Sequence, residues 1–277
     1  MSKSLYVDDF AIYCSSRRPE LAHRQLQLCL HHLQLWTEQT GLEFSPQKTV
    51  SLHMCRVRNC PRSSPNLELS GVVLRHVETC KFLGMIIDSS LTWRCHLSQL
   101  KYSCMQSLNL LRHISHTSFG ADRVTLLRLY LALIKPKLDY GSEAYGSACT
   151  SLLDTLQPIQ NAALRIATGA YRTSPVASLH AETGILPLKY YRDTKALTYL
   201  SRLRTAEPPY ILEILQSVDR PLFERNHQRA HPFLLRMETA LRRYDVALDG
   251  AQVSPPRALP PWQTYCIFAC EKLSHLK

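Results

Sequence analysis

The stretch that decides the fold is residues 4–14, which read Ser-Leu-Tyr-Val-Asp-Asp-Phe-Ala-Ile-Tyr-Cys. Apolar and aromatic side chains flank two adjacent acids, Asp8 and Asp9. Neighbouring side chains of a regular strand point to opposite faces, so a strand running straight through would bury one carboxylate at high cost. We therefore expect a tight β-hairpin that carries both acids at its tip.

The acidic pair admits two interpretations. An ordinary hairpin turn explains it, since Asp is common at turns, and the dipeptide taken alone favours this simpler explanation. A cation site explains it as well, because a bound metal ion offsets the cost of placing carboxylates together. Mg²⁺ fits such a site, since it accepts hard oxygen ligands, often one or two carboxylates together with substrate phosphates.

The first 90 residues predict a short antiparallel sheet with one helix. After the hairpin, the pattern predicts a helix that begins at Pro19, where proline is tolerated in the first turn, and ends at Gly41. Further short strands are expected at 49–54, 69–74 and 79–88, and a basic, proline-containing loop is expected at 56–66.

Beyond residue 90 the apolar residues change their spacing to three and four, which is typical of amphipathic helices. The expected helices cover 97–111, 122–135 (ending at Pro136), 152–168 (closed by Gly169) and 188–205. Four prolines in residues 254–262 indicate an extended linker. The expected fold class is therefore α+β: a partial sheet domain at 1–90, an all-helical part at 91–206 and a partly disordered connector and proline-rich tail at 207–277.

Composition narrows the class of protein further. The 277 residues include 33 Lys and Arg against 22 Asp and Glu, a net charge of +11 that favours polyanionic partners. Residues 101–205 carry 13 basic and 6 acidic groups, so the excess of +7 lies in the middle of the chain. Ten cysteines without repeating spacing, no visible signal peptide and no long apolar run exclude secreted, disulfide-stapled and membrane-spanning classes. We expect an intracellular protein, cytoplasmic or nuclear.

Several segments together resemble one family. The hairpin Tyr-Val-Asp-Asp-Phe resembles the catalytic hairpin of reverse transcriptases, and the next segments are similar to those of non-LTR (LINE-type, jockey- and I-like) retrotransposon polymerases. These segments are 6–10, 41–49 (Gly-Leu-Glu-Phe-Ser-Pro-Gln-Lys-Thr), 80–88 (Cys-Lys-Phe-Leu-Gly-Met-Ile-Ile-Asp), 126–146 and 156–165. The resemblance covers about residues 4–205 in the same order and spacing. It implies the end of a polymerase palm followed by a helical thumb and connector.

The resemblance also implies residue roles. Asp8 and Asp9 would be catalytic and hold Mg²⁺, while Lys48 would stabilise or protonate the leaving pyrophosphate. The residues expected to contact the incoming dNTP or the primer are Tyr6, Val7, Phe82, Leu83 and Gly84. The expected contacts to nucleic-acid phosphates are Lys101, Arg112, Arg123, Arg128, Lys135, Lys137, Arg165 and Arg172. An RNA template, a DNA primer or their duplex, and dNTP are the expected partners, and no membrane is expected.

The family pattern is incomplete in this sequence. Such polymerases need a further metal-binding Asp and the fingers upstream of the hairpin, and only five residues precede Tyr6. We therefore expect a fragment of an RNA-directed DNA polymerase that lacks its N-terminal polymerase segment and does not polymerise by itself. The alternatives are a non-catalytic nucleic-acid-binding helical module and a non-functional transposon remnant. A zinc site at His53, Cys55 and Cys60 is a weaker possibility, because the spacing is unlike that of structural zinc sites.

Overall fold

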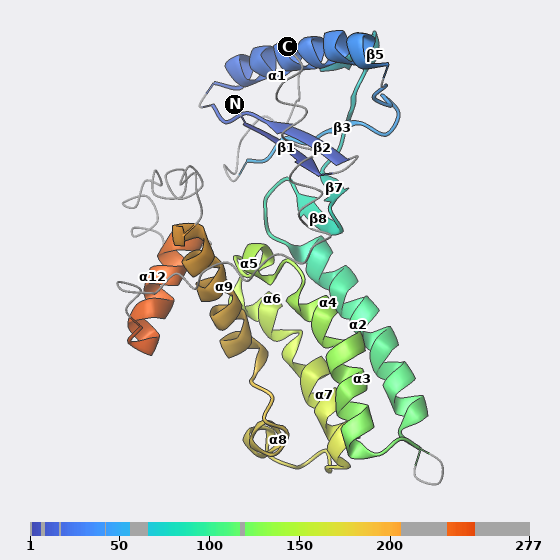
Figure 1. The fold of residues 1–277 in the computed structure, drawn as a ribbon, viewed down its shortest axis with the longest axis vertical. Coiled ribbons are helices and arrows are strands. Elements are labelled where there is room, and N and C mark those ends of the chain that lie inside the picture. The colour runs from blue at the N-terminus through green and yellow to red at the C-terminus, as the bar shows by residue number, and fades with distance from the viewer. Residues whose placement is uncertain are drawn as a thin grey trace, which may run out of the picture.

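The computed structural model describes residues 2–6, 9–16, 18–41, 43–55, 66–116, 120–205 and 232–246. The long helix α1 and several small sheets gather at one end of the molecule, and a bundle of helices forms the rest (Figure 1). This arrangement confirms the expected α+β class. None of the described helices is long and apolar enough to cross a lipid bilayer.

The N-terminal hairpin forms as expected. Strands β1 (Ser2–Tyr6) and β2 (Asp9–Tyr13) pair antiparallel, with Tyr6 opposite Asp9. Val7 and Asp8 come between the two strands in the sequence and lie outside the described residues. Asp9 occupies the first position of β2.

Helix α1 (Pro19–Thr40) covers this end of the molecule. Its end is fixed by Gly41, which adopts a left-handed conformation (φ 71°) and donates its N–H to the Thr37 carbonyl. Leu30 of α1 packs into a small cluster with Leu67, Leu69 and Leu74. Both predicted bounds of the helix are confirmed. They could be predicted because the backbone preferences of proline and glycine fix where a helix begins and ends.

The short strands differ from the prediction. Strand β3 (Val50–Ser51) is shorter than the expected 49–54 and pairs in parallel with β6 (Arg75–His76). The expected strand at 69–74 is wrong: β4 (Glu68–Leu69) and β5 (Val72–Val73) form an antiparallel hairpin. Ser70 and Gly71 both have positive φ and make the turn that breaks the strand. Nearly all of the expected loop at 56–66 lies outside the described residues.

The hairpin expected at 79–88 is present. Strands β7 (Thr79–Phe82) and β8 (Met85–Asp88) pair antiparallel through a two-residue turn. Both turn residues have positive φ, 46° at Leu83 and 77° at Gly84, as a type I′ turn requires. This turn twists the strands in the natural right-handed sense and carries the segment expected to contact the primer.

The helical bundle follows directly. Its elements are α2 (Arg94–Ile114), α3 (Arg123–Leu133), α4 (Lys135–Asp139), α5 (Ser142–Tyr145), α6 (Thr150–Asp154), α7 (Gln157–Thr168), α8 (Val176–Thr183), α9 (Leu188–Thr205) and α12 (Phe233–Tyr244). The helix expected at 122–135 ends before Pro136 as predicted, but Pro136 lies in the first turn of a new helix, α4. The helix expected at 152–168 is divided, because Pro158 lies in the first turn of α7. Proline is tolerated there but not in a helix interior, so the chain restarts a helix at each of them. The end of α7 at Gly169 and the bounds of α9 agree with the prediction.

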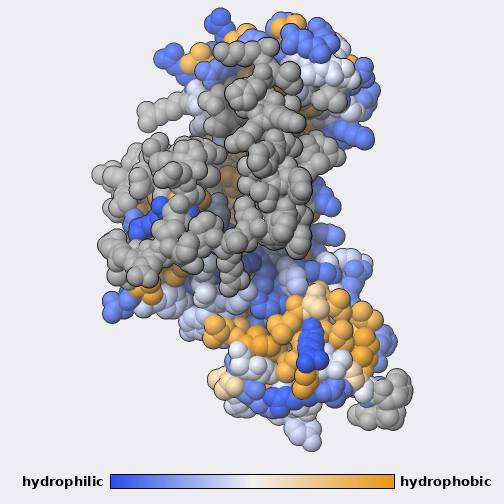
Figure 2. Space-filling view, in the orientation of Figure 1, coloured by the Kyte–Doolittle hydropathy of each residue, from blue (hydrophilic) through white to orange (hydrophobic). Residues whose placement is uncertain are grey.

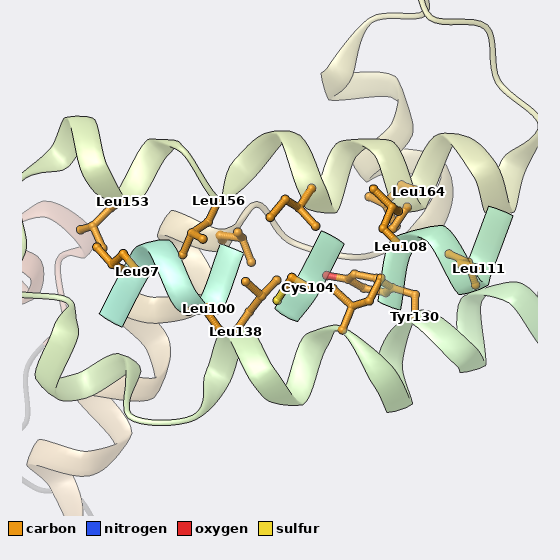
Figure 3. Packing of buried hydrophobic residues seen from close by; sticks show 14 of the residues in the cluster. Leu97, Leu100, Cys104, Leu108, Leu111, Tyr130, Leu138, Leu153, Leu156 and Leu164 are labelled. Atoms are coloured by element: carbon orange, nitrogen blue, oxygen red, sulfur yellow. The ribbon is translucent and has the colours of Figure 1, made fainter. Parts of the chain in front are cut away.

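One continuous core holds the bundle together. The apolar side of α2 packs between α3 and α4 on one side and α6 and α7 on the other (Figure 3). The central side chains are at most 9% exposed: Leu97, Leu100, Cys104, Leu108, Leu111, Tyr130, Leu138, Leu153, Leu156 and Leu164. Removing that much apolar surface from water is the main favourable term for this half of the chain.

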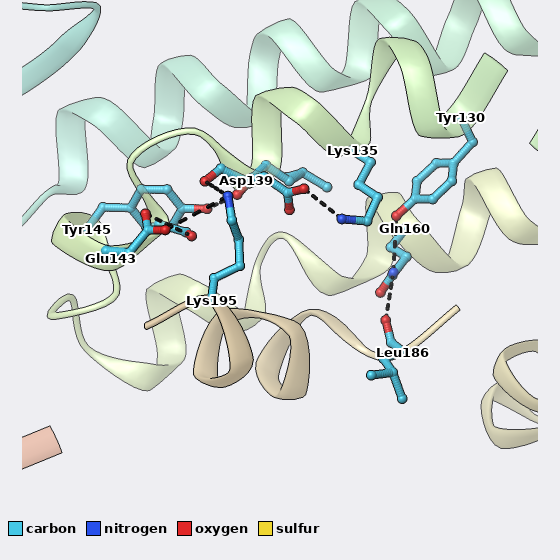
Figure 4. A network of polar contacts seen from close by, with 10 residues as sticks. Tyr130, Lys135, Asp139, Glu143, Tyr145, Gln160, Leu186 and Lys195 are labelled. Atoms are coloured by element: carbon cyan, nitrogen blue, oxygen red, sulfur yellow. Dashed lines mark hydrogen bonds and ion pairs between the residues drawn. The ribbon is translucent and has the colours of Figure 1, made fainter. Parts of the chain in front are cut away.

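Buried polar groups link the helices to one another. Gln160, 1% exposed, donates from its amide to the Tyr130 hydroxyl at 3.1 Å and to the Leu186 carbonyl at 3.0 Å (Figure 4). Lys195 of α9 donates to the carbonyl of Asp139 at the end of α4 (3.1 Å). The Gln160 bonds satisfy a side chain that would otherwise be buried without a partner, and the Lys195 bond ties α9 directly to α4. Helix α9 is therefore held to the bundle by directed contacts as well as by packing.

Helix α2 begins where it does because of Asp88, the last residue of β8. Its carboxylate is buried and accepts hydrogen bonds from the backbone N–H groups of Ser90 (3.1 Å), Thr92 (2.9 Å) and Trp93 (2.7 Å). The Thr92 hydroxyl lies 3.2 Å from the same carboxylate. These bonds hold the connection between β8 and α2, including the left-handed backbone at Leu91 and Trp93.

We expect Asp88→Ala to lower the free energy of unfolding by about 3 kcal/mol, because several buried N–H groups lose a charged acceptor together. Urea denaturation measures the change. Asp122→Ala is the matched control, since Asp122 also precedes a helix but accepts one hydrogen bond from the Thr125 N–H. A loss for Asp88→Ala no larger than that of the control would contradict this role.

Candidate nucleic-acid interface

The acidic hairpin offers one described carboxylate. Asp9 is exposed at the start of β2. Asp8 and Val7 lie outside the described residues, and so does the side chain of Tyr6. An exposed carboxylate is the hard oxygen ligand that Mg²⁺ accepts, but within the described ranges no three His, Cys, Asp or Glu side chains gather into a metal site. The metal and catalytic roles of Asp8 and Asp9 stay predictions.

The segment that carries Lys48 packs next to this hairpin. The rings of Phe10 in β2 and Phe44 lie 5.7 Å apart, centroid to centroid. A turn follows in which the Lys48 N–H and the Thr49 hydroxyl both donate to the Ser45 carbonyl, at 3.2 and 2.8 Å. Lys48 itself is exposed on that turn. The fold thus brings together two segments that are 34 residues apart and that the resemblance assigns to the same reaction.

The turn of the second hairpin is attached to the helical bundle. The Tyr140 hydroxyl donates to the Leu83 carbonyl at 2.5 Å. A β-carbon at Gly84 would lie 3.4 Å from the Tyr140 ring, and one at Gly141 would lie 2.5 Å from the Met85 sulfur. Residues expected to contact the primer are therefore held in a fixed position relative to the junction of α4 and α5.

A buried histidine lies where this hairpin meets α2. His96 is 7% exposed, and its ring contacts those of Trp93 (centroids 6.1 Å apart) and Tyr145 (5.5 Å). Its Nδ1 lies 3.4 Å from the Ile86 N–H, while no described group hydrogen-bonds its Nε2. Burial lowers the pKa of His96, so the ring is neutral in the folded protein near neutral pH.

The basic residues expected to contact phosphates differ in their exposure and in their partners. Five of them are exposed: Lys101, Arg112, Arg123, Arg128 and Arg172. Arg112 also donates to the Asn109 side chain one turn away at 2.9 Å. Arg123 and the three half-buried residues have partners on other parts of the bundle or on their own helix. Arg123 pairs with Glu182 (2.7 Å), Lys135 pairs with Asp139 (2.6 Å) and lies over the Tyr191 ring, Lys137 donates to the hydroxyls of Ser103 and Ser107 (2.9 Å each), and Arg165 donates to the Ser174 carbonyl (3.3 Å). These contacts give these four basic residues a structural role in the bundle.

Helix α2 carries a line of basic residues, of which Lys101 and Arg112 were predicted from the sequence and Arg94 was not. Arg94, Lys101 and Arg112 are exposed and separated by seven and eleven residues, which is about two and three helical turns. They therefore lie along one side of the helix over roughly 27 Å, and we call them the basic stripe. The signal was available, because residues 89–138 contain seven Lys and Arg and one acid, Asp122. Tyr102, 61% exposed, lies on the solvent side of the same helix.

Comparison with known proteins gives the class. No protein-family model and no solved structure matches the chain. Curated proteins do match, and they are RNA-directed DNA polymerases of Drosophila mobile elements. The chain is thus homologous to the RNA-directed DNA polymerases of non-LTR retrotransposons, which confirms the family that its motifs indicated.

Three relatives show the extent of the likeness. The probable RNA-directed DNA polymerase from transposon BS of Drosophila melanogaster is 28% identical over 199 residues, 72% of this chain and 22% of that protein. The polymerase from mobile element jockey of Drosophila funebris is 26% identical over 165 residues, 60% and 18% of the two chains. The probable polymerase from transposon X-element of Drosophila melanogaster is 21% identical over 164 residues, 59% and 18%. The chain thus aligns with about a fifth of the length of these relatives.

We expect Gly141→Ala to destabilise the protein by about 2 kcal/mol, because the flexible end of Met85 must shift to make room for the new methyl group, in addition to the cost of a positive φ. Gly169→Ala is the control: Gly169 has nearly the same φ (68° against 67°) and no atom near its absent β-carbon, so it reports the backbone cost alone, about 1 kcal/mol. Chemical denaturation measures both. Adding Met85→Ala should recover part of the loss at Gly141 and none at Gly169, and equal losses in the two single variants would contradict the contact.

The buried His96 makes stability depend on pH. Its pKa is lower in the folded chain than in the unfolded chain, so the unfolded chain binds the proton more readily. The neutral His96 ring contributes fully to the free energy of unfolding above about pH 6.5, and this contribution is lost as the pH falls toward the pKa of His96 in the folded chain. His96→Gln should flatten the fall in melting temperature below that pH. His113→Gln, on the exposed side of α2, should leave it unchanged, and the opposite result would contradict the assignment.

Proposed function

We propose that this chain works in RNA-directed DNA synthesis, where its helical bundle holds a template–primer duplex and its N-terminal hairpins face the reacting end of the primer. The observation that carries the proposal is the homology to RNA-directed DNA polymerases over up to 72% of the chain. The order of the two hairpins and the bundle along the chain supports the same assignment.

The basic stripe supports the duplex-binding part of the proposal. A duplex is a polyanion, and neutralising its phosphates supplies most of the sequence-independent affinity of proteins for it. Arg94, Lys101 and Arg112 present positive charge along one helix side that has no acid of its own. Exposed Arg128 on α3 adds to this charge, whereas the basic residues with internal partners maintain the bundle that displays it.

The hairpins support the catalytic part. In the proposed reaction the primer 3′-hydroxyl attacks the α-phosphate of a dNTP and pyrophosphate leaves. Asp8 and Asp9 would hold Mg²⁺, which when bound neutralises charge on the phosphate oxygens. The exposed Lys48 ammonium would donate a proton or a charge-assisted hydrogen bond to the leaving pyrophosphate. Tyr6 and Val7 would lie beside the dNTP, and the Phe82–Gly84 turn, held by Tyr140, would position the primer.

The second candidate is a non-catalytic nucleic-acid-binding module. It is favoured by the fact that the core of the bundle is built from residues after Met85 and does not involve the acidic hairpin. Binding could therefore persist where nucleotidyl transfer does not. A transposon remnant without function would show neither property.

Lys101→Ala and Arg112→Ala should each weaken binding of a fluorescein-labelled RNA–DNA hybrid of about 20 base pairs. Each should also reduce the slope of log K against log salt concentration by roughly 0.9, the contribution of one phosphate contact. Fluorescence anisotropy between 50 and 200 mM salt measures both, a range in which phosphate-driven binding changes strongly. Arg24→Ala, an exposed arginine on α1, is the control and should bind like the unaltered chain.

The duplex-binding proposal would be overturned if the affinity for the hybrid did not change with salt concentration. It would also be overturned if Arg24→Ala reduced the affinity as much as Lys101→Ala and Arg112→Ala. Primer extension on an RNA template with Mg²⁺ and dNTP then separates the two candidates. Extension that is lost in Asp8→Asn supports the polymerase, and duplex binding without extension supports the binding module.

A further inference from the structure

Helices α9 and α12 lie side by side at the edge of the bundle (Figure 1). Side chains of α9, together with Tyr244 and Val246, line an open cleft there. Ala196 and Leu200 of α9 pack against Met237 of α12 and join the two helices. Beside this contact the cleft has a volume of about 450 Å³, within the usual range of ligand sites. It lies outside both hairpins and outside the basic stripe, so the proposed function gives it no role.

Two tyrosines line the cleft from opposite helices. The rings of Tyr190 and Tyr244 have centroids 6.4 Å apart and meet edge to face at 62°. Tyr244 is held in place because its hydroxyl donates to Asp193 at 2.7 Å, and the Arg243 guanidinium lies 3.7 Å from the same carboxylate. Tyr190 is 47% exposed. The cleft therefore has one fixed aromatic side chain and one whose ring is accessible to a ligand.

Hydroxyl groups along α9 supply hydrogen-bond acceptors. Thr194 and Thr198 line the cleft one turn apart, and their hydroxyls donate to the carbonyls of Tyr190 and Thr194 at 2.9 Å each. Since these protons are already used, the oxygen lone pairs remain to accept a hydrogen bond from a ligand. A flat ring with N–H groups on its edge satisfies both the tyrosines and the threonines.

The charge around the cleft indicates what else the ligand carries. Helices α9 and α12 contain eight Lys and Arg and two acids, Asp193 and Glu238. Lys195 and Arg236 donate to backbone carbonyls inside the protein, Arg192 is half-buried, and Arg243 pairs with Asp193. The other four basic residues of these two helices are exposed: Lys189, Arg202, Arg204 and Arg242. Positive charge next to an aromatic surface is the combination with which proteins hold single-stranded nucleic acid, stacking the base and attracting the phosphates. We propose that the α9–α12 cleft binds an unpaired base of single-stranded RNA or DNA. This site is separate from the duplex-binding stripe but rests on the proposed function, because both take nucleic acid.

The test compares two probes on the full chain: a fluorescein-labelled single-stranded oligouridylate of 12 nucleotides and the RNA–DNA hybrid used above. Tyr190→Ala should weaken binding of the single strand by about 5- to 150-fold, the range for loss of one stacked base, and change hybrid binding by less than about twofold. Thr198→Val, which keeps the shape and removes the acceptor, should give a smaller loss in the same direction.

Tyr171→Ala is the matched control, since Tyr171 is 83% exposed between α7 and α8 and does not line the cleft. It should bind both probes like the unaltered chain, and thermal melting confirms that each variant is folded. Single-strand affinity that is unchanged in Tyr190→Ala, or equally reduced in Tyr171→Ala, overturns the proposed site. If the hybrid binds and the single strand does not, the cleft proposal fails while the proposed function stands; if neither binds, both fail.

Discussion

The buried carboxylate of Asp88 is the interaction on which the rest of the structure depends. It ends one hairpin and begins the longest helix of the bundle, and it binds three backbone N–H groups within five residues. A carboxylate that loses its water is stable only with such partners, so its bonds fix the path of the chain between β8 and α2. That path sets the direction of α2, and α2 both forms the centre of the apolar core and carries the basic stripe.

The position of the Leu83–Gly84 turn relative to α2 is fixed as well. The turn is joined to the bundle by the Tyr140 hydroxyl, and the Met85 side chain packs where a β-carbon at Gly141 would lie. His96, Trp93 and Tyr145 fill the space between the hairpin and α2. A chain end that contacted this turn would therefore be held at a set distance from a duplex on α2, which is what extension of a primer requires.

The sequence predicted those helix ends that are set by the backbone preference of a single residue. Gly41 and Gly169 end helices because glycine adopts positive φ at little cost, and both ends were predicted. Pro136 was correctly predicted to follow the end of a helix, but the new helix that it begins was not predicted. The helix predicted at 152–168 ran through Pro158, which instead lies in the first turn of α7. The motifs identified the hairpins. The contact of Lys135 with the Tyr191 ring, the bond of Lys137 to Ser107 and the bond of Tyr140 to Leu83, however, join residues 30 to 57 positions apart. Spacing along one element carries no information about such contacts.

The hydrogen bonds of Gln160 to Tyr130 and Leu186 have a consequence for how the helices of the bundle separate from one another. The Gln160 amide satisfies the Leu186 carbonyl just before α9, while Gln157 of the same helix accepts the N–H of Leu188. Detaching α9 breaks both bonds and exposes a polar side chain that is otherwise buried at the centre of the core. We therefore expect helices α3, α7 and α9 to open together rather than one at a time, so that their most protected amide hydrogens share a common free energy of opening.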